Sequence, residues 1–217
     1  MQTNRIFAGL LAMAMLASTP LTIIAGTHGP DKRPGAVVTK TVTYAVDTEQ
    51  STIVWNAKKV GGEHTGNIKL SKGEFVFNGN KLTAGTFTAD MTSLSENKGN
   101  ERVVGHLKND DFFAVDKNPT ATFKVTKLAP ISGAAAGQPN YNVTGDLMIK
   151  GTTKPITFPA TVKLEGDNVE ATAKLTVNRL DYDIKYRAAI IGTAADKIIE
   201  DTFSLDLKLV GKKSKPM

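Results

Sequence analysis

The chain has 217 residues, 41% of them hydrophobic and 22% charged, a composition that suits a single folded domain and excludes a disordered chain. It contains no cysteine, which excludes a disulfide framework, a thiolate nucleophile and a cysteine-ligated zinc site. The net charge of +6 is scattered between predicted strands except for a cluster at residues 212–215. This pattern argues against nucleic-acid binding and allows peripheral contact with anionic membranes.

The N-terminal segment has the pattern of a secretory signal peptide. Residues 6–17 form an uncharged apolar stretch directly after Arg5, and the next charged residue is Asp31. Small residues around Ala25 offer a cleavage site, whereas Pro20 disfavours the alternative of an uncleaved membrane anchor. We therefore predict an exported protein. Its expected segments are a signal peptide at 1–26, a tether at 27–41, a folded domain at 42–211 and a basic tail at 212–217.

From residue 41 onward, apolar and polar residues alternate in short segments separated by turn residues. The clearest hairpin spans residues 73–91, where Asn78 and Gly79 form a dipeptide favoured in two-residue turns. Alternation of this kind predicts antiparallel strands with one buried face, arranged as a sandwich or a barrel. Further segments with a period of two follow at 121–126, 141–149, 156–164, 169–177 and 203–210.

Two segments break this pattern. Residues 96–113 carry Val103, Val104 and Leu107 at helical spacing, which predicts a short helix that covers part of the barrel. Residues 132–140 are rich in glycine and alanine and are expected to form a loop.

Several segments together resemble the YceI-like family of bacterial periplasmic lipid-binding proteins, in the family's order over residues 42–210. The most specific are RVVGHLK at 102–108, which runs into DFF at 111–113, and GDLMIKGTTKP at 145–155. At Val103 this chain departs from the family, which usually has an acidic residue beside the arginine. The other matching segments are YAVD at 44–47 with Trp55, HTG at 64–66, residues 73–77, NPTATF at 118–123 and NRLDY at 178–182.

The resemblance implies an all-β fold, namely an extended eight-stranded antiparallel lipocalin-like β-barrel with a short helical cap. It also implies a periplasmic location, a tunnel that binds, stores or carries an isoprenoid, quinone or other long apolar lipid, and the formation of homodimers. No other cofactor is expected. Burying ten methylene equivalents contributes about 8 kcal/mol, which corresponds to roughly micromolar binding without any catalytic group.

The residues expected to line this tunnel are apolar and come from many strands. They are Trp55, Phe75, Phe77, Phe87, Leu107, Phe112, Phe113, Phe123, Leu147, Phe158 and Phe203. A polar or phosphorylated ligand head group is expected to contact Arg102, His106 or Arg179.

Other functions remain as alternatives. His106 with Asp111 could serve a hydrolase or isomerase at the barrel mouth, but no G-x-S-x-G motif is present, so we interpret His106 as a structural residue that hydrogen-bonds loop backbone. The three histidines lack metal-binding spacing, and no metal site or enzymatic activity is expected. An envelope stress or interaction module without a small ligand is the remaining hypothesis.

Overall fold

A computed structural model describes residues 40–215 of the chain. The predicted signal peptide, residues 27–39 of the predicted tether and the last two residues of the predicted tail lie outside this range. Nine strands make up most of the described chain. They are β1 (Thr41–Val46), β2 (Thr52–Lys59), β3 (Gly62–Asn78), β4 (Lys81–Asp90), β5 (Thr120–Pro130), β6 (Tyr141–Ile149), β7 (Thr152–Glu165), β8 (Asn168–Asn178) and β9 (Ile199–Lys213).

The helical elements are few and short. The predicted helix is confirmed as α1 (Glu101–Lys108), which begins after Asn100, whose side chain accepts a hydrogen bond from the backbone N–H of Val103. A membrane-spanning helix, which needs a long run of apolar residues, is not found within residues 40–215. The 3₁₀ helices are Met91–Ser93, Arg179–Tyr182, Ala189–Ile191 and Ala195–Lys197.

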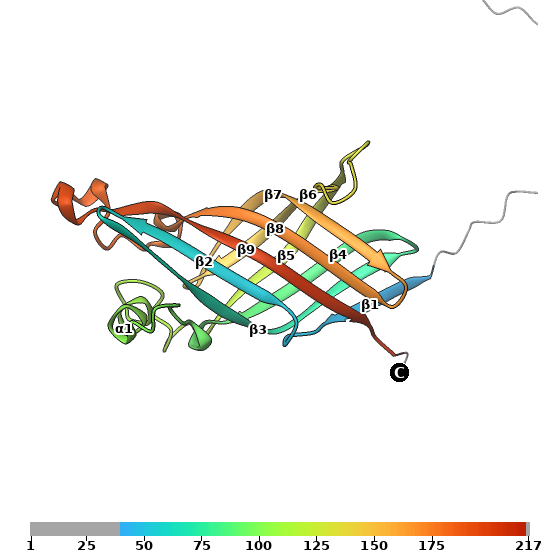
Figure 1. The fold of residues 1–217 in the computed structure, drawn as a ribbon, viewed down its shortest axis with the longest axis horizontal. Coiled ribbons are helices and arrows are strands. Elements are labelled where there is room, and N and C mark those ends of the chain that lie inside the picture. Colours follow the sequence, from blue (N-terminus) through green and yellow to red (C-terminus); the bar gives the residue numbers. More distant parts are fainter. Residues whose placement is uncertain (1–39, 216–217) are drawn as a thin grey trace, which may run out of the picture. The chain divides into compact units, whose positions relative to one another are not determined.

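The strands close into a barrel in which each strand pairs antiparallel with its neighbours (Figure 1). Closure comes from the long strand β3, which pairs with β4 on one side and with both β1 and β2 on the other. Because β1 and β2 pair with different parts of β3 and also both pair with β9, they share one position in the barrel. The nine strands therefore fill eight positions, which confirms the predicted eight-stranded barrel.

The alternation in the sequence explains which face of each strand is inside. In β9, Phe203, Leu205, Leu207 and Leu209 all face the barrel interior, as the period of two predicts. The hairpin between β3 and β4 turns where predicted, at Gly79, which takes a φ of 59°. Such a positive φ costs glycine little, because it has no Cβ.

The two ends of the barrel differ. At one end, α1 and the loop between β8 and β9 lie near the turn between β2 and β3 (Figure 1). The other end carries two turns, one between β3 and β4 and one between β7 and β8. The loop over residues 131–140 also lies there, and it is irregular as predicted. Strand β9 continues to Lys213 at this second end, so the first residues of the basic cluster belong to the sheet.

Candidate ligand-binding site

The barrel interior is hollow rather than filled by side chains. Leu205, Leu207 and Phe123 face the inside, yet each keeps part of its surface accessible. In a close-packed barrel core, inward-facing leucine and phenylalanine side chains would be fully buried. Their partial exposure shows that there is free space inside the barrel.

This space is an apolar cavity of about 150 Å³, and all the space between atoms in the region of its lining residues, adjoining solvent included, is about 1160 Å³. Every strand except β1 contributes lining residues. Of the residues in the described chain that line it, only Thr122 and Thr172 have polar side chains. Gly145 makes room for the Phe123 ring, since a Cβ on Gly145 would lie 2.6 Å from a carbon of that ring. The surface offered to a ligand is therefore almost entirely hydrocarbon.

Seven of the eleven residues predicted to line a tunnel face this cavity. All seven are aromatic or aliphatic, and they come from β3, β4, β5, β6, β7, β9 and the loop after α1. They are Phe75, Phe87, Phe113, Phe123, Leu147, Phe158 and Phe203.

A second, smaller cavity of about 50 Å³ lies under α1 and the loop between β8 and β9. Trp55, Leu107 and Phe112 line it, which accounts for three more of the predicted residues. It shares Ile68, Phe113 and Phe203 with the larger cavity, so the two spaces are adjacent. The rings of Phe113 and Phe203 meet edge to face with their centroids 6.4 Å apart, at the boundary between the two cavities.

Phe77 is the exception among the predicted lining residues. It is 1% exposed and packs edge to face against Tyr44, with ring centroids 5.3 Å apart. Tyr44 and Leu82 belong to the same packed cluster near the end of the barrel where β3 turns into β4. Phe77 therefore belongs to a filled part of the core and lines neither cavity.

Comparison with known proteins identifies the family. The YceI-like domain matches residues 44–211, which is more than half of the chain. This chain belongs to the YceI-like family. A UPF0312 protein of Pseudomonas putida strain W619 is 28% identical over 181 residues, covering 79% of this chain and 87% of that protein. A UPF0312 protein of Pseudomonas fluorescens strain SBW25 is 29% identical over the same length.

Solved structures agree with the barrel described above. The crystal structure of BcnA from Burkholderia cenocepacia is similar with a TM-score of 0.63 and 26% identity, covering 76% of this chain and 98% of that one. A polyisoprenoid binding domain from Saccharophagus degradans, implicated in plant cell wall breakdown, has a TM-score of 0.56. At 16% identity over 79% of this chain and 98% of that domain, the second likeness supports the fold alone.

In this YceI-like barrel, Arg179 donates all its hydrogen bonds to the protein itself. The residue is 4% exposed, and its guanidinium donates five hydrogen bonds, as many as it has N–H groups. Arg179 lies at the edge of the smaller cavity, but its donors are used to hold the loop between β8 and β9 against the start of β9. The acceptors are the backbone oxygens of Ile184, Tyr186, Ile199 and Glu200 and a carboxylate oxygen of Asp201.

The other two predicted head-group residues also lie outside the larger cavity. Arg102 is exposed on α1 and lines neither cavity. His106 Nε2 lies 3.0 Å from a carboxylate oxygen of Asp111, and its ring packs against Phe112 and Tyr186 with centroids 4.9 and 4.6 Å away. The expected contact of His106 with loop backbone is therefore replaced by a contact with a side chain. Within residues 40–215, no group of three or more potential metal ligands comes together.

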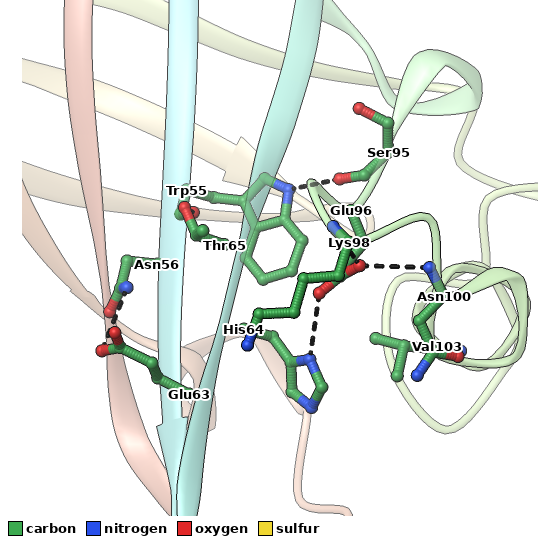
Figure 2. Close-up of polar contacts among 10 residues, drawn as sticks. All are labelled: Trp55, Asn56, Glu63, His64, Thr65, Ser95, Glu96, Lys98, Asn100 and Val103. Carbon is green, nitrogen blue, oxygen red and sulfur yellow. Dashed lines mark hydrogen bonds and ion pairs between the residues drawn. The ribbon is translucent and has the colours of Figure 1, made fainter.

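Sequence reasoning missed the contacts that hold α1 at the barrel (Figure 2). Trp55 Nε1 donates to the backbone oxygen of Ser95 at 3.0 Å, and the carboxylate of Glu96, with a side chain only 1% exposed, lies 3.3 Å from Nδ1 of His64. The other carboxylate oxygen accepts from the backbone N–H groups of Lys98 and Asn100, at 2.8 and 3.1 Å. These bonds fix the segment that leads into α1, which covers the smaller cavity.

The environment of Glu96 makes the stability of this segment dependent on pH. The hydrogen bond from the Asn100 N–H, followed by those from His64 and the Lys98 N–H, holds the Glu96 pKa below its usual range despite burial. A carboxyl group whose pKa is lower in the folded protein stabilises it above the pKa of the unfolded chain, and this stabilisation is lost as the pH falls through the folded value.

We therefore expect Glu96→Gln to lower the melting temperature at pH 7, and the difference from the unmodified protein to shrink as the pH falls below the ordinary glutamate range. Thermal unfolding followed by circular dichroism between pH 7 and pH 3 measures both effects. Glu74→Gln, an exposed change on the same strand as His64, is the control and should change the melting temperature little. A constant difference at every pH would contradict this role of the Glu96 charge.

Proposed function

We propose that this protein binds an apolar small molecule of the isoprenoid or quinone class inside the barrel and stores or carries it in the periplasm. The observation that supports this most directly is the hollow interior, whose lining is hydrocarbon apart from Thr122 and Thr172. The Saccharophagus degradans neighbour is a polyisoprenoid binding domain, which points in the same direction. The apolar segment near the N-terminus supports export.

The size of the cavity defines what such a ligand requires. An apolar cavity of about 150 Å³ holds a benzene-sized group, so the interior accepts a short apolar segment without rearrangement. A chain of several isoprene units needs the half-buried side chains, such as Leu205 and Phe123, to move within the larger empty volume. Binding by burial alone needs no acid, base or metal, which is why we propose a binding protein rather than an enzyme.

Native mass spectrometry of the protein purified from a bacterial periplasm, followed by organic extraction, tests this proposal. We expect a bound species of several hundred daltons that extraction identifies as a prenyl lipid or quinone. A bare protein mass, together with no uptake of added ubiquinone or polyprenyl phosphate, would overturn it and favour an interaction module. The same spectra report whether homodimers form.

A further inference from the structure

Exposed apolar side chains gather at one end of the barrel. In the described part of the chain, the large hydrophobic residues that are exposed are Val60, Ile190 and Ile191, at 53%, 77% and 56%. A backbone hydrogen bond joins the turn with Val60 to the end of the loop with the two isoleucines: the Val60 N–H donates to the oxygen of Ile198 at 3.0 Å. We call these three residues the apolar tip.

The loop that presents the two isoleucines is folded and uncharged. Residues 188–195, with the sequence AAIIGTAA, carry no ionisable side chain. Ala188 is fully buried, and its backbone oxygen accepts from the Thr193 hydroxyl at 2.8 Å, which closes the loop. Arg179 holds the preceding residues against β9. The isoleucines are therefore displayed to solvent by a folded loop, and exposed apolar side chains that gather on one surface are typical of interaction sites.

The charges beside the apolar tip narrow the choice of partner. Lys185 and Arg187 precede the loop, Lys197 follows it, and Lys58 and Lys59 come from the neighbouring strand β2, all with exposed side chains. Asp183 and Asp196 pair with Lys185 and Lys197 at 2.6 and 2.7 Å. Lys58, Lys59 and Arg187 form no ion pair within the described residues. A small apolar surface with adjacent cations suits an anionic lipid surface.

A second copy of the chain fits these observations less well. Stable protein interfaces bury on the order of 1,200 Å² or more, which three side chains at the end of a barrel do not supply. A bilayer has no such requirement, since each apolar side chain that enters it contributes separately.

The apolar tip lies at the end of the barrel where the smaller cavity is found. Residues on both sides of the tip, Ala57 of β2 and Ile199 of β9, line the smaller cavity under α1, which adjoins the large interior cavity. We propose that the apolar tip inserts into an anionic phospholipid bilayer and holds this end of the barrel at the membrane. The membrane contact does not depend on the proposed function. A further consequence, that a lipid-soluble ligand enters and leaves the barrel at this end without crossing water, rests on the proposed function.

Flotation with vesicles tests the membrane contact directly. Residues 40–215 contain the complete closed barrel, and 98% of the BcnA chain is matched by only 76% of this chain, so this segment is used to avoid the apolar N-terminus. We expect it to float with vesicles of phosphatidylethanolamine and phosphatidylglycerol, and less with phosphatidylcholine alone. The double variant Ile190→Ser, Ile191→Ser should lower the partition coefficient about tenfold.

Two matched controls separate the apolar tip from general surface effects. Ala134→Ser with Ala135→Ser changes an exposed loop at the opposite end of the barrel and should leave flotation unchanged. Lys58→Glu with Lys59→Glu should weaken flotation, whereas Lys212→Glu with Lys213→Glu makes the same charge change at the far end and should weaken it less. Circular dichroism confirms that each variant is folded.

The results distinguish membrane insertion from dimer formation, and both from ligand binding. No flotation of the unmodified segment, or equal flotation of the isoleucine variant, overturns the proposal. If light scattering shows dimers that the isoleucine variant converts to monomers, the tip contacts a second copy and the membrane proposal fails. Equilibrium binding of ubiquinone, measured without vesicles, should be unaffected by the isoleucine changes. Its absence with normal flotation would reject the proposed function while leaving the membrane contact intact.

Discussion

Replacing Ala173 with phenylalanine should lower the affinity for an apolar ligand by about a hundredfold while the barrel stays folded. Ala173 lies on β8 and faces the cavity, where it pairs in register with Ala160 of β7 and Leu207 of β9. The cavity of about 150 Å³ is large enough to accept the added ring. Losing the burial of three or four methylene groups of ligand costs about 3 kcal/mol, which gives the expected loss of affinity.

Thr176→Phe is the matched control for this change. It places the same ring on the same strand, at an exposed position that does not line the cavity. Titration with ubiquinone, followed by quenching of Trp55 fluorescence, should show weakened binding only for the Ala173 variant. Filling a cavity with apolar atoms adds contacts, so the melting temperature should stay equal or rise. Unchanged affinity in a folded Ala173→Phe protein would show that the ligand does not occupy the barrel interior.

Arg179→Ala should destabilise the protein by about 3 kcal/mol, the largest loss of stability that we expect from a single polar side chain. The change removes five hydrogen bonds and takes the donors away from backbone oxygens of the loop between β8 and β9 and of the start of β9, of which the bond to Ile184 is buried and the others are partly buried. Such unsatisfied groups are more costly than the loss of the bonds alone suggests. Urea unfolding measures the effect: the midpoint concentration of urea should fall, while the slope of the unfolding free energy against urea concentration should stay the same.

Arg187→Ala and Arg179→Lys serve as controls for this interpretation. Arg187 is exposed on the same loop, with its guanidinium 5.2 Å from the centre of the Tyr186 ring, so its loss should cost well under half as much. Arg179→Lys keeps the charge but lacks the planar arrangement of donors, and should recover only part of the stability. If Arg179→Ala instead leaves stability unchanged and weakens ligand binding, the original expectation of a head-group contact is correct.

Much of the architecture could be predicted because β-strands have a short and regular period. Alternation in residues 203–210 placed Phe203, Leu205 and Leu207 on one face, and the structure places that face inside. The dipeptide at Asn78 and Gly79 located a turn from purely local conformational preferences. The break in alternation before residue 113 located α1 for the same local reason.

The roles of individual residues depended on contacts that local patterns do not contain. Phe75 and Phe77 have the same spacing and the same type of side chain, yet only Phe75 lines the cavity, because Tyr44 and Leu82 fill the space beside Phe77. Arg179 could have been a ligand contact or a loop anchor. The answer depends on backbone oxygens up to 21 residues away in the chain.

The strand pattern, the inward faces, the family and the apolar character of the interior could be predicted from the amino-acid sequence, because they depend on residue type and short-range spacing. The tertiary structure alone shows that the barrel is hollow, that a second cavity lies under α1, and that Val60 is hydrogen-bonded to Ile198, which follows the loop with Ile190 and Ile191. These features arise where strands distant in the chain meet. The volume left between their side chains depends on the packing of all of them together.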